Sequence, residues 1–190
     1  AYEKLQKEYE EKNKAYEAKV AAQTKELSDK YYPILSQYTD RVTAFDRDSV
    51  TALSSEDLLV GDGEEITGTT KFAAYYILWG PEGKAIEQSI DTAKSQLNAP
   101  MSVETGLDNA SLIDGWKEGM KGMKIGGVRE LSIPSDKAYG EAGSKDSNGK
   151  EKIAPNTPLK FIVMAIPMPE TFEQPDTTAL FEAYQKLNQQ

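Results

Sequence analysis

The sequence predicts an α+β domain with a helical segment at each end. Residues 1–46 contain no Gly and follow a helical pattern, whereas from about residue 50 Gly, Pro and Asn recur between short β-type runs. Among those runs, residues 115–122 form one helical stretch that is too short to be stable alone. That helix must therefore lie on a sheet built by the strands.

The N-terminal segment, residues 1–48, predicts a helical arm. Residues 1–30 are rich in Lys, Glu, Ala and Gln, which favour helix. Its apolar residues form a narrow stripe at helical spacing: Tyr2, Leu5, Tyr9, Tyr16 and Val20. Three roles stay open for an arm with so thin an apolar face: packing on its own domain, a spacer from a membrane anchor, or dimerisation. The Tyr-rich stripe favours packing.

A stronger amphipathic pattern follows the arm's first helix. Its apolar residues recur at steps of three or four: Leu27, Tyr31, Ile34, Leu35, Tyr38, Val42 and Phe45. Pro33 stands inside this run, and proline is tolerated in a first helical turn but kinks a helix interior. We therefore expect either a new helix starting near Ser28 or Asp29, or one bent helix, ending near Asp46.

Residues 49–168 predict the α+β domain itself. The main strands are expected at residues 71–79, 127–134 and 158–166, with a turn at 80–83 and shorter strands near 50–60 and 100–106. Residues 169–190 predict a Pro-containing connector and then a short helix. Thr177 is the expected cap of that helix, and one face carries Leu180, Phe181, Tyr184 and Leu187.

Composition excludes several kinds of function. The 190 residues include no Cys and no His, which removes disulfides, thiolate nucleophiles, Ser–His–Asp chemistry and the usual zinc ligands. The net charge of −9 disfavours nucleic acid as a partner, because phosphate contacts need a basic face. An enzyme built from this chain must use carboxylates, Lys or Tyr, or no proton transfer. We expect no cofactor and no metal.

Residues 112–140 read LIDGWKEGMKGMKIGGVRELSIPSDKAYG and resemble the FKBP-type peptidyl-prolyl cis–trans isomerase family. The positions that carry the resemblance are Leu112, Ile113, Gly115, Trp116, Gly122, Met123, Gly126, Gly127, Tyr139 and Gly140. Upstream and downstream stretches extend it over roughly residues 50–166. The resemblance implies a curved antiparallel sheet of five or six strands wrapped around one short helix. It also implies a rotamase that acts in protein folding, with proline-containing polypeptide clients and macrolide inhibitors as ligands.

This activity suits a chain without His or Cys. The barrier to rotation about an X–Pro bond, about 18–20 kcal/mol, comes from amide resonance, which is charge-separated and stabilised by water. The twisted transition state loses that charge separation, so a water-poor apolar pocket favours rotation without an acid or a base.

The resemblance also implies roles for individual residues. Trp116 would form the floor under the proline ring, with Tyr76 and Phe161 as aromatic walls and Leu112 and Ile113 along one side. The Ile113 backbone N–H and the Tyr139 hydroxyl would each bind a substrate carbonyl, and Ile153 would close the pocket. Taken singly, most of these residues are ordinary core residues, and only their joint spacing indicates a site.

Three pocket positions depart from the family's pattern. Ile86 and Glu87 replace a Phe-Asp pair, and Met101 replaces a third aromatic wall. Because Met is flexible and Ile lacks a ring, we expect a less preorganised pocket with weaker catalysis and weaker macrolide binding. The alternative function is a weakly or non-catalytic module that binds proline-containing segments, with a chaperone role. The loop 141–152 is about five residues longer than usual. It predicts a solvated turn with Asn148-Gly149 at its tip, and altered client selection is the alternative.

The chain's location and oligomeric state stay open. No apolar run is long enough to cross a bilayer. The first residues, AYEKLQKEYEEK, open in mid-helix without an initiator Met, which suggests a trimmed chain. A membrane-anchored protein outside the cytoplasm, with its anchor removed, and a cytoplasmic protein are the two expectations.

Overall fold

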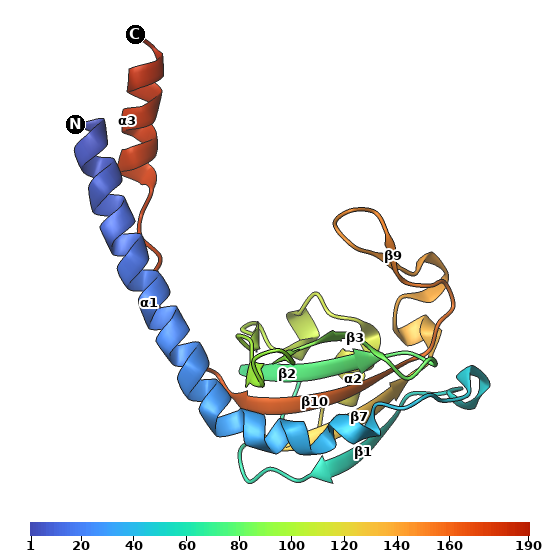
Figure 1. The fold of residues 1–190 in the computed structure, drawn as a ribbon. Helices are drawn as coiled ribbons and strands as arrows, with labels where there is room; N and C mark the ends of the chain where they lie inside the picture. The colour runs from blue at the N-terminus through green and yellow to red at the C-terminus, as the bar shows by residue number, and fades with distance from the viewer. The chain divides into compact units, whose positions relative to one another are not determined.

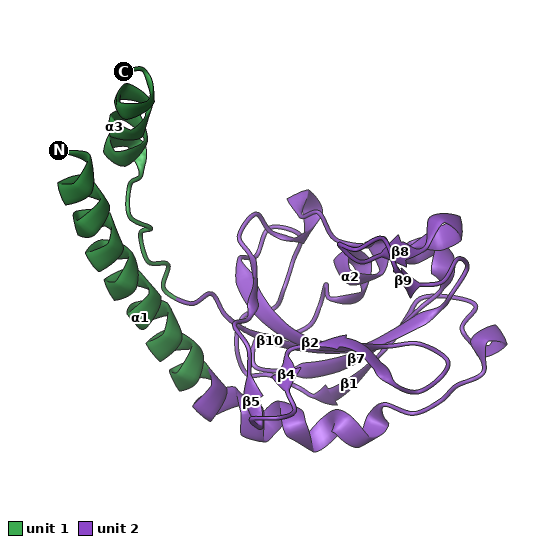
Figure 2. Cartoon of the chain, turned by 45° about the horizontal axis from the view of Figure 1, so that its top comes forward, with its two compact units in different colours: residues 1–27, 170–190 green, residues 28–169 purple.

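The computed structural model describes residues 1–190. The chain divides into two compact units: residues 28–169 form one, and residues 1–27 with 170–190 form the other (Figure 2). No helix of the chain is both long enough and apolar enough to span a membrane.

The unit 28–169 is built on a six-stranded antiparallel sheet with the order β1-β7-β10-β2-β3, and β6 pairs with β2 (Figure 1). Its strands are β1 (Ser54–Leu59), β2 (Phe72–Trp79), β3 (Ala85–Gln88), β6 (Met101–Val103), β7 (Val128–Ile133) and β10 (Leu159–Pro167). The only α-helix between these strands is the short α2 (Asp114–Gly119). The predicted α+β class and the sheet wrapped around one short helix are therefore confirmed.

Smaller elements complete this unit. Two hairpins pair β4 (Ile90–Asp91) with β5 (Gln96–Leu97), and β8 (Ser144–Lys145) with β9 (Glu151–Ile153). Five 3-10 turns are η1 (Ser36–Arg41), η2 (Arg47–Ser49), η3 (Leu107–Asn109), η4 (Ser135–Lys137) and η5 (Gly140–Ala142).

The main core lies between the sheet and α2. Alternate residues of a strand face opposite sides, so Phe72, Ala74 and Leu78 of β2 all join the cluster that contains Trp116. The helix lies very close to β7, since a Cβ added to Gly119 would stand 2.9 Å from the Leu131 Cδ2 atom. This close approach sets the depth at which Trp116 is held.

The opposite face of the sheet is covered by residues 28–46. Tyr31 and Leu35 are buried, and the Tyr31 ring lies 6.1 Å from the ring of Tyr75 on β2. The indole of Trp79 donates a hydrogen bond of 3.1 Å to the Thr43 carbonyl. These contacts place residues 28–46 in the same compact unit as the sheet, although composition had grouped them with the arm.

Of the two expected arrangements, the structure has the single helix. The helix α1 runs without a break from Tyr2 to Leu35 with Pro33 inside it, and η1 continues to Arg41, so the helical stretch ends a little before the expected Asp46. Pro33 lies in the last turn, where it removes only one backbone donor, and Gln37 Nε2 donates to its carbonyl at 2.9 Å. Burial of Tyr31 and Leu35 on the sheet stabilises this final turn.

In the other unit, residues 170–190 run along the first 27 residues of α1. Gln23 Nε2 donates to the Glu170 carbonyl at 2.8 Å, and the rings of Tyr2 and Tyr184 lie 6.0 Å apart. The second helix of this unit is α3 (Thr178–Asn188). Thr177 stands at the expected N-cap position, but its side chain makes no capping bond, and Asp176 Oδ1 accepts from the Thr178 N–H at 2.9 Å.

Candidate functional site

A cavity of about 360 Å³ opens on the α2 side of the sheet. Its lining residues are Tyr76, Leu78, Glu87, Met101, Ser111, Leu112, Ile113, Trp116, Tyr139 and Phe161. Eight of the ten residues proposed from sequence are among them, and Ile86 and Ile153 are not. Three aromatic rings form the deep part of this cavity, which we call the aromatic pocket.

The three rings of the aromatic pocket contact one another. The Trp116 ring meets those of Tyr76 and Phe161 at 5.5 Å each, with interplanar angles of 85° and 83°. Such edge-to-face pairs are the favoured packing of aromatic side chains. Trp116 is 3% exposed and therefore a core residue, and its side chain also lines the cavity.

The sheet register brings the two wall residues together. On β2 and β10, Tyr76 pairs with Val163, and Leu78 pairs with Phe161. Tyr76 and Phe161 are therefore diagonal neighbours on the face that α2 covers, with ring centroids 6.1 Å apart. Leu78 lines the pocket because it lies two residues from Tyr76 on the same face.

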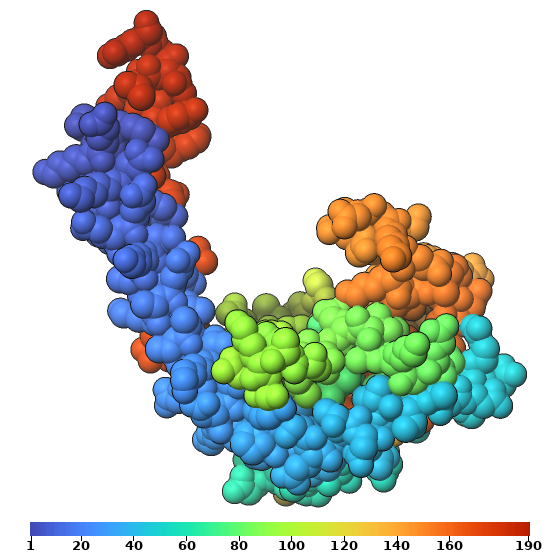
Figure 3. Space-filling model, viewed as in Figure 1, coloured from blue at the N-terminus to red at the C-terminus, as the bar shows by residue number.

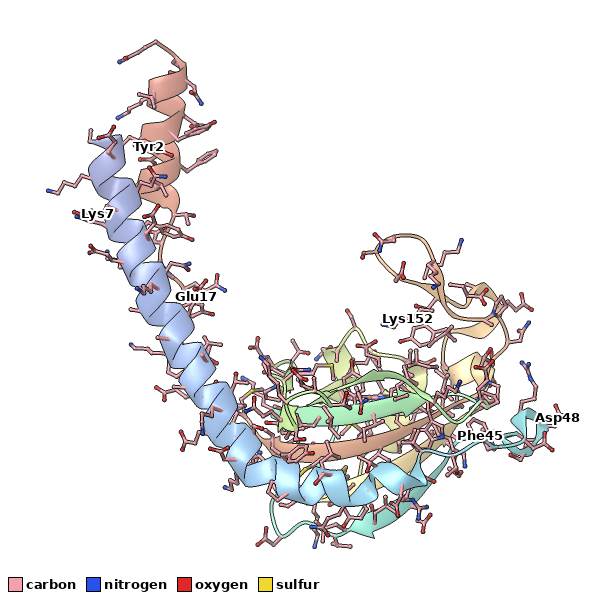
Figure 4. All side chains as sticks on the ribbon, in the orientation of Figure 1. Tyr2, Lys7, Glu17, Phe45, Asp48 and Lys152 are labelled. Atoms are coloured by element: carbon pink, nitrogen blue, oxygen red, sulfur yellow. The ribbon has the colours of Figure 1, made fainter.

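Glu87 organises the polar rim of the pocket. The Tyr76 hydroxyl donates a hydrogen bond to one of its carboxylate oxygens, and the Lys152 ammonium forms an ion pair with the other. Lys152 is labelled in Figure 4. Burial acts to raise the pKa of Glu87, but hydrogen bonds from Lys152 and Tyr76 outweigh it and hold that pKa below its usual value. Burial and the bond to Glu87 raise the pKa of Tyr76 far above its usual value, so its hydroxyl stays neutral.

Two residues that line the pocket, Tyr139 and Ile113, carry hydrogen-bond donors without a protein partner. The Tyr139 side chain is 37% exposed and its hydroxyl makes no hydrogen bond within the chain, while burial, followed by the nearby Glu87 charge, raises its pKa. Ile113 precedes α2 in extended conformation, and its carbonyl accepts from the Trp116 N–H at 3.0 Å. Its own N–H donates to no protein group.

The two remaining predicted residues line a second cavity of about 440 Å³ beside the first. Ile86 is partly exposed there, and Ile153 is a buried core residue. Glu87 follows Ile86 in the chain, and Lys152 precedes Ile153. These two residues form an ion pair in which Glu87 lines the aromatic pocket and Lys152 lines the second cavity. Their roles in ligand binding remain predictions.

The long loop 141–152 projects from the surface (orange in Figure 3). Its tip is a turn in which Asp146 Oδ1 accepts from the N–H groups of Asn148 and Lys150, each at 2.9 Å, and Gly149 adopts a positive φ of 78°. At its base lies Lys152, which sequence reasoning missed. No sequence pattern indicates that contact, because it depends on how the loop folds back.

Sequence reasoning also missed Ser111 and Leu78 as lining residues. Ser111 directly precedes the predicted pair Leu112 and Ile113, so its position in the sequence could have predicted it as a lining residue. Leu78 lies two residues after Tyr76 in the same strand, so the alternation of side chains along a strand could have predicted that it faces the pocket.

The sheet, the short helix and the aromatic pocket define an α+β domain with a cavity lined by three contacting aromatic rings. The model of the FKBP-type peptidyl-prolyl cis-trans isomerase family matches residues 63–166. The chain therefore belongs to this family, whose general activity is peptidyl-prolyl isomerisation.

Relatives agree with this assignment. FK506-binding protein 4 of Dictyostelium discoideum is 35% identical over 113 residues, which is 60% of this chain and 27% of that protein. An FK506-binding protein of Neisseria meningitidis serogroup A is 34% identical over 93 residues, covering 49% of this chain and 79% of that one. The crystal structure of AtFKBP13 superposes with a TM-score of 0.51 at 28% identity, over 62% of this chain and 93% of that one.

Proposed function

We propose that this protein catalyses cis–trans isomerisation of X–Pro bonds in polypeptide clients, with the proline ring in the aromatic pocket. The observation that carries the proposal is the trio of contacting rings, Tyr76, Trp116 and Phe161, beneath two unpaired donors. Macrolides that present a similar ring and carbonyls would compete for the same pocket.

The proposed mechanism uses desolvation and orientation. An amide moved from water into the aromatic pocket loses the solvent that stabilises its charge-separated resonance form, and rotation becomes easier. The Ile113 N–H and the Tyr139 hydroxyl would hold the client carbonyls on either side of the twisting bond. A neutral Tyr76 hydroxyl, already bonded to Glu87, would keep its ring fixed as a wall.

Two observations favour a second candidate, a module that binds proline-containing segments with little turnover. Ile86 lies on the second cavity and not on the aromatic pocket, and the half-buried Met101 supplies a flexible wall instead of a ring. A pocket with fewer rigid walls holds the twisted amide less tightly than a fully aromatic one.

A proline-isomerisation assay on a tetrapeptide tests the first candidate, with Trp116→Ala and Tyr139→Phe as comparison variants. We expect measurable turnover by the natural sequence and a loss with Trp116→Ala. Equal inactivity of the natural sequence and Trp116→Ala, together with retained peptide binding, would select the binding module.

Restoring the family's residues separates an impaired enzyme from a competent one. If Ile86→Phe with Glu87→Asp raises kcat/KM at least tenfold, the present site is impaired and the binding module gains support. If kcat/KM is unchanged or falls, the present pocket is already competent, and the longer Glu87 side chain is suited to its two partners.

A further inference from the structure

The ion pair between Lys152 and Glu87 joins two parts of the molecule that are far apart in sequence. Glu87 belongs to β3, at the edge of the main sheet, and Lys152 belongs to β9, in the hairpin that carries the long loop. The hairpin makes only the β8–β9 pairing within itself and belongs to a separate two-stranded sheet. At the base of the hairpin, Ile153 is buried in the core, and the ion pair from the neighbouring Lys152 to β3 is a second, side-chain attachment of the loop to the main sheet.

The same contact ends at the aromatic pocket. One oxygen of Glu87 pairs with Lys152 while the other accepts from the Tyr76 hydroxyl, so a single carboxylate connects the loop to a pocket wall. Hydrogen bonds to an ionised carboxylate are stronger than neutral ones, and two donors together restrict its rotation. Lys152 itself lines only the second cavity and does not line the aromatic pocket.

We propose that Lys152 is a positioning residue: through Glu87 it holds the Tyr76 hydroxyl in place and fastens the 141–152 loop as the partition between the aromatic pocket and the second cavity. This proposal deepens the proposed function, because it assigns to the same site a residue that touches no client. Removing Lys152 would leave Glu87 with one partner and the loop attached to the domain through the buried Ile153 without its side-chain contact to β3.

The expected effect is modest. The Lys152 and Glu87 side chains are 35% and 40% exposed, and ion pairs with that much solvent contact are weak. We expect Lys152→Met to lower kcat/KM for a proline tetrapeptide about threefold. Lys152→Arg keeps the charge and should restore most of the loss.

Lys150→Met is the matched control, since it removes the same charge from the same loop and the Lys150 side chain makes no ion pair. We expect it to match the natural sequence. A double-mutant cycle tests the route through Glu87: in a Glu87→Gln background, Lys152→Met should cause no additional loss, because coupled residues are non-additive. Additive losses, or equal losses in Lys150→Met and Lys152→Met, would overturn the proposal.

A second measurement does not depend on turnover. Hydrogen–deuterium exchange of the amides in residues 141–153 should be faster in Lys152→Met and Glu87→Gln, by a similar factor, and unchanged in Lys150→Met. If the natural sequence shows no isomerase activity, the proposed function fails while this exchange pattern still decides whether Lys152 anchors the loop. Unchanged exchange in Lys152→Met sinks the proposal even if the enzyme is active.

Discussion

Trp116 on α2 and Phe161 on β10 meet edge to face, with their ring centroids 5.5 Å apart. Both side chains also belong to the main hydrophobic core, at 3% and 4% exposure. The residues that form the floor of the aromatic pocket are therefore also core residues, and the same packing that stabilises the fold fixes the shape of the pocket. A substitution there changes stability and activity together, and the two effects must be measured separately.

Trp116→Ala should destabilise the protein by about 3–5 kcal/mol, because it removes a large buried side chain and leaves a cavity among the rings. Urea unfolding followed by circular dichroism measures this cost. Trp116→Phe keeps an aromatic floor and should retain most of the stability. If both variants remain folded at the assay temperature and turn over proline peptides as fast as the natural sequence, the indole is only a core residue.

Tyr139→Phe should change activity without changing stability. The Tyr139 hydroxyl has no partner in the chain, so its removal leaves no buried group unsatisfied. If that hydroxyl binds a client carbonyl, the loss of one neutral hydrogen bond, about 0.5–1.5 kcal/mol, should lower kcat/KM by a factor of about two to twelve. Tyr38→Phe, on the other side of the sheet, is a control for the loss of a hydroxyl. Unaltered kcat/KM in Tyr139→Phe would exclude this role.

The contribution of Glu87 to stability should depend on pH in a defined direction. Its pKa in the folded state is held below the ordinary value of 4.5 despite burial, by the hydrogen bonds from Lys152 and Tyr76. A lowered folded pKa gives stability that is present above pH 4.5 and is lost as the pH falls through the folded value. Since the side chain is 40% exposed, solvent screening keeps this contribution below about 1 kcal/mol.

The measurement compares urea unfolding of the natural sequence and Glu87→Gln from about pH 7 down to about pH 3. The difference in unfolding free energy between the two proteins should shrink as the pH falls below 4.5. Glu151→Gln, in the same hairpin but without an ion pair, should give a much smaller pH-dependent difference. A gap between the natural sequence and Glu87→Gln that is constant or widens at low pH contradicts the assigned shift.

The main strands and α2 could be predicted because their signals are local. β2 and β10 are continuous apolar runs, and a strand with that pattern is buried on both faces. The same pattern implies a second covering layer, which the structure supplies with residues 28–46. Composition alone had assigned those residues to the arm, because a helix that covers a sheet and an exposed helix both use helix-forming residues.

Most of the pocket lining followed from the family resemblance, since the rings occupy fixed places on strands and α2. The polar contacts could not be predicted in the same way. Lys152 reaches Glu87 only because the β8–β9 hairpin folds back, and a pairing 65 residues apart in the chain leaves no trace in local periodicity. Likewise, Ile86 and Glu87 are adjacent in β3 but line different cavities, because neighbouring residues of a strand face opposite ways.

The boundary of the folded domain gives the final prediction. Leu35 is fully buried and Tyr31 packs on Tyr75, so residues 28–46 supply the second face of the core. We propose that residues 28–169 fold alone, and that residues 49–169 do not, because the shorter piece exposes the apolar back of β2 and β10. Thermal unfolding and one-dimensional proton spectra of the two pieces compare them directly. Leu35→Ala in the full chain should cost about 2–5 kcal/mol by the same reasoning, whereas Leu5→Ala, in the arm, should leave the unfolding of the 28–169 unit unchanged. A cooperatively folded 49–169 piece with the stability of 28–169 would show that the helical segment is dispensable to the core and that the domain begins where the composition changes.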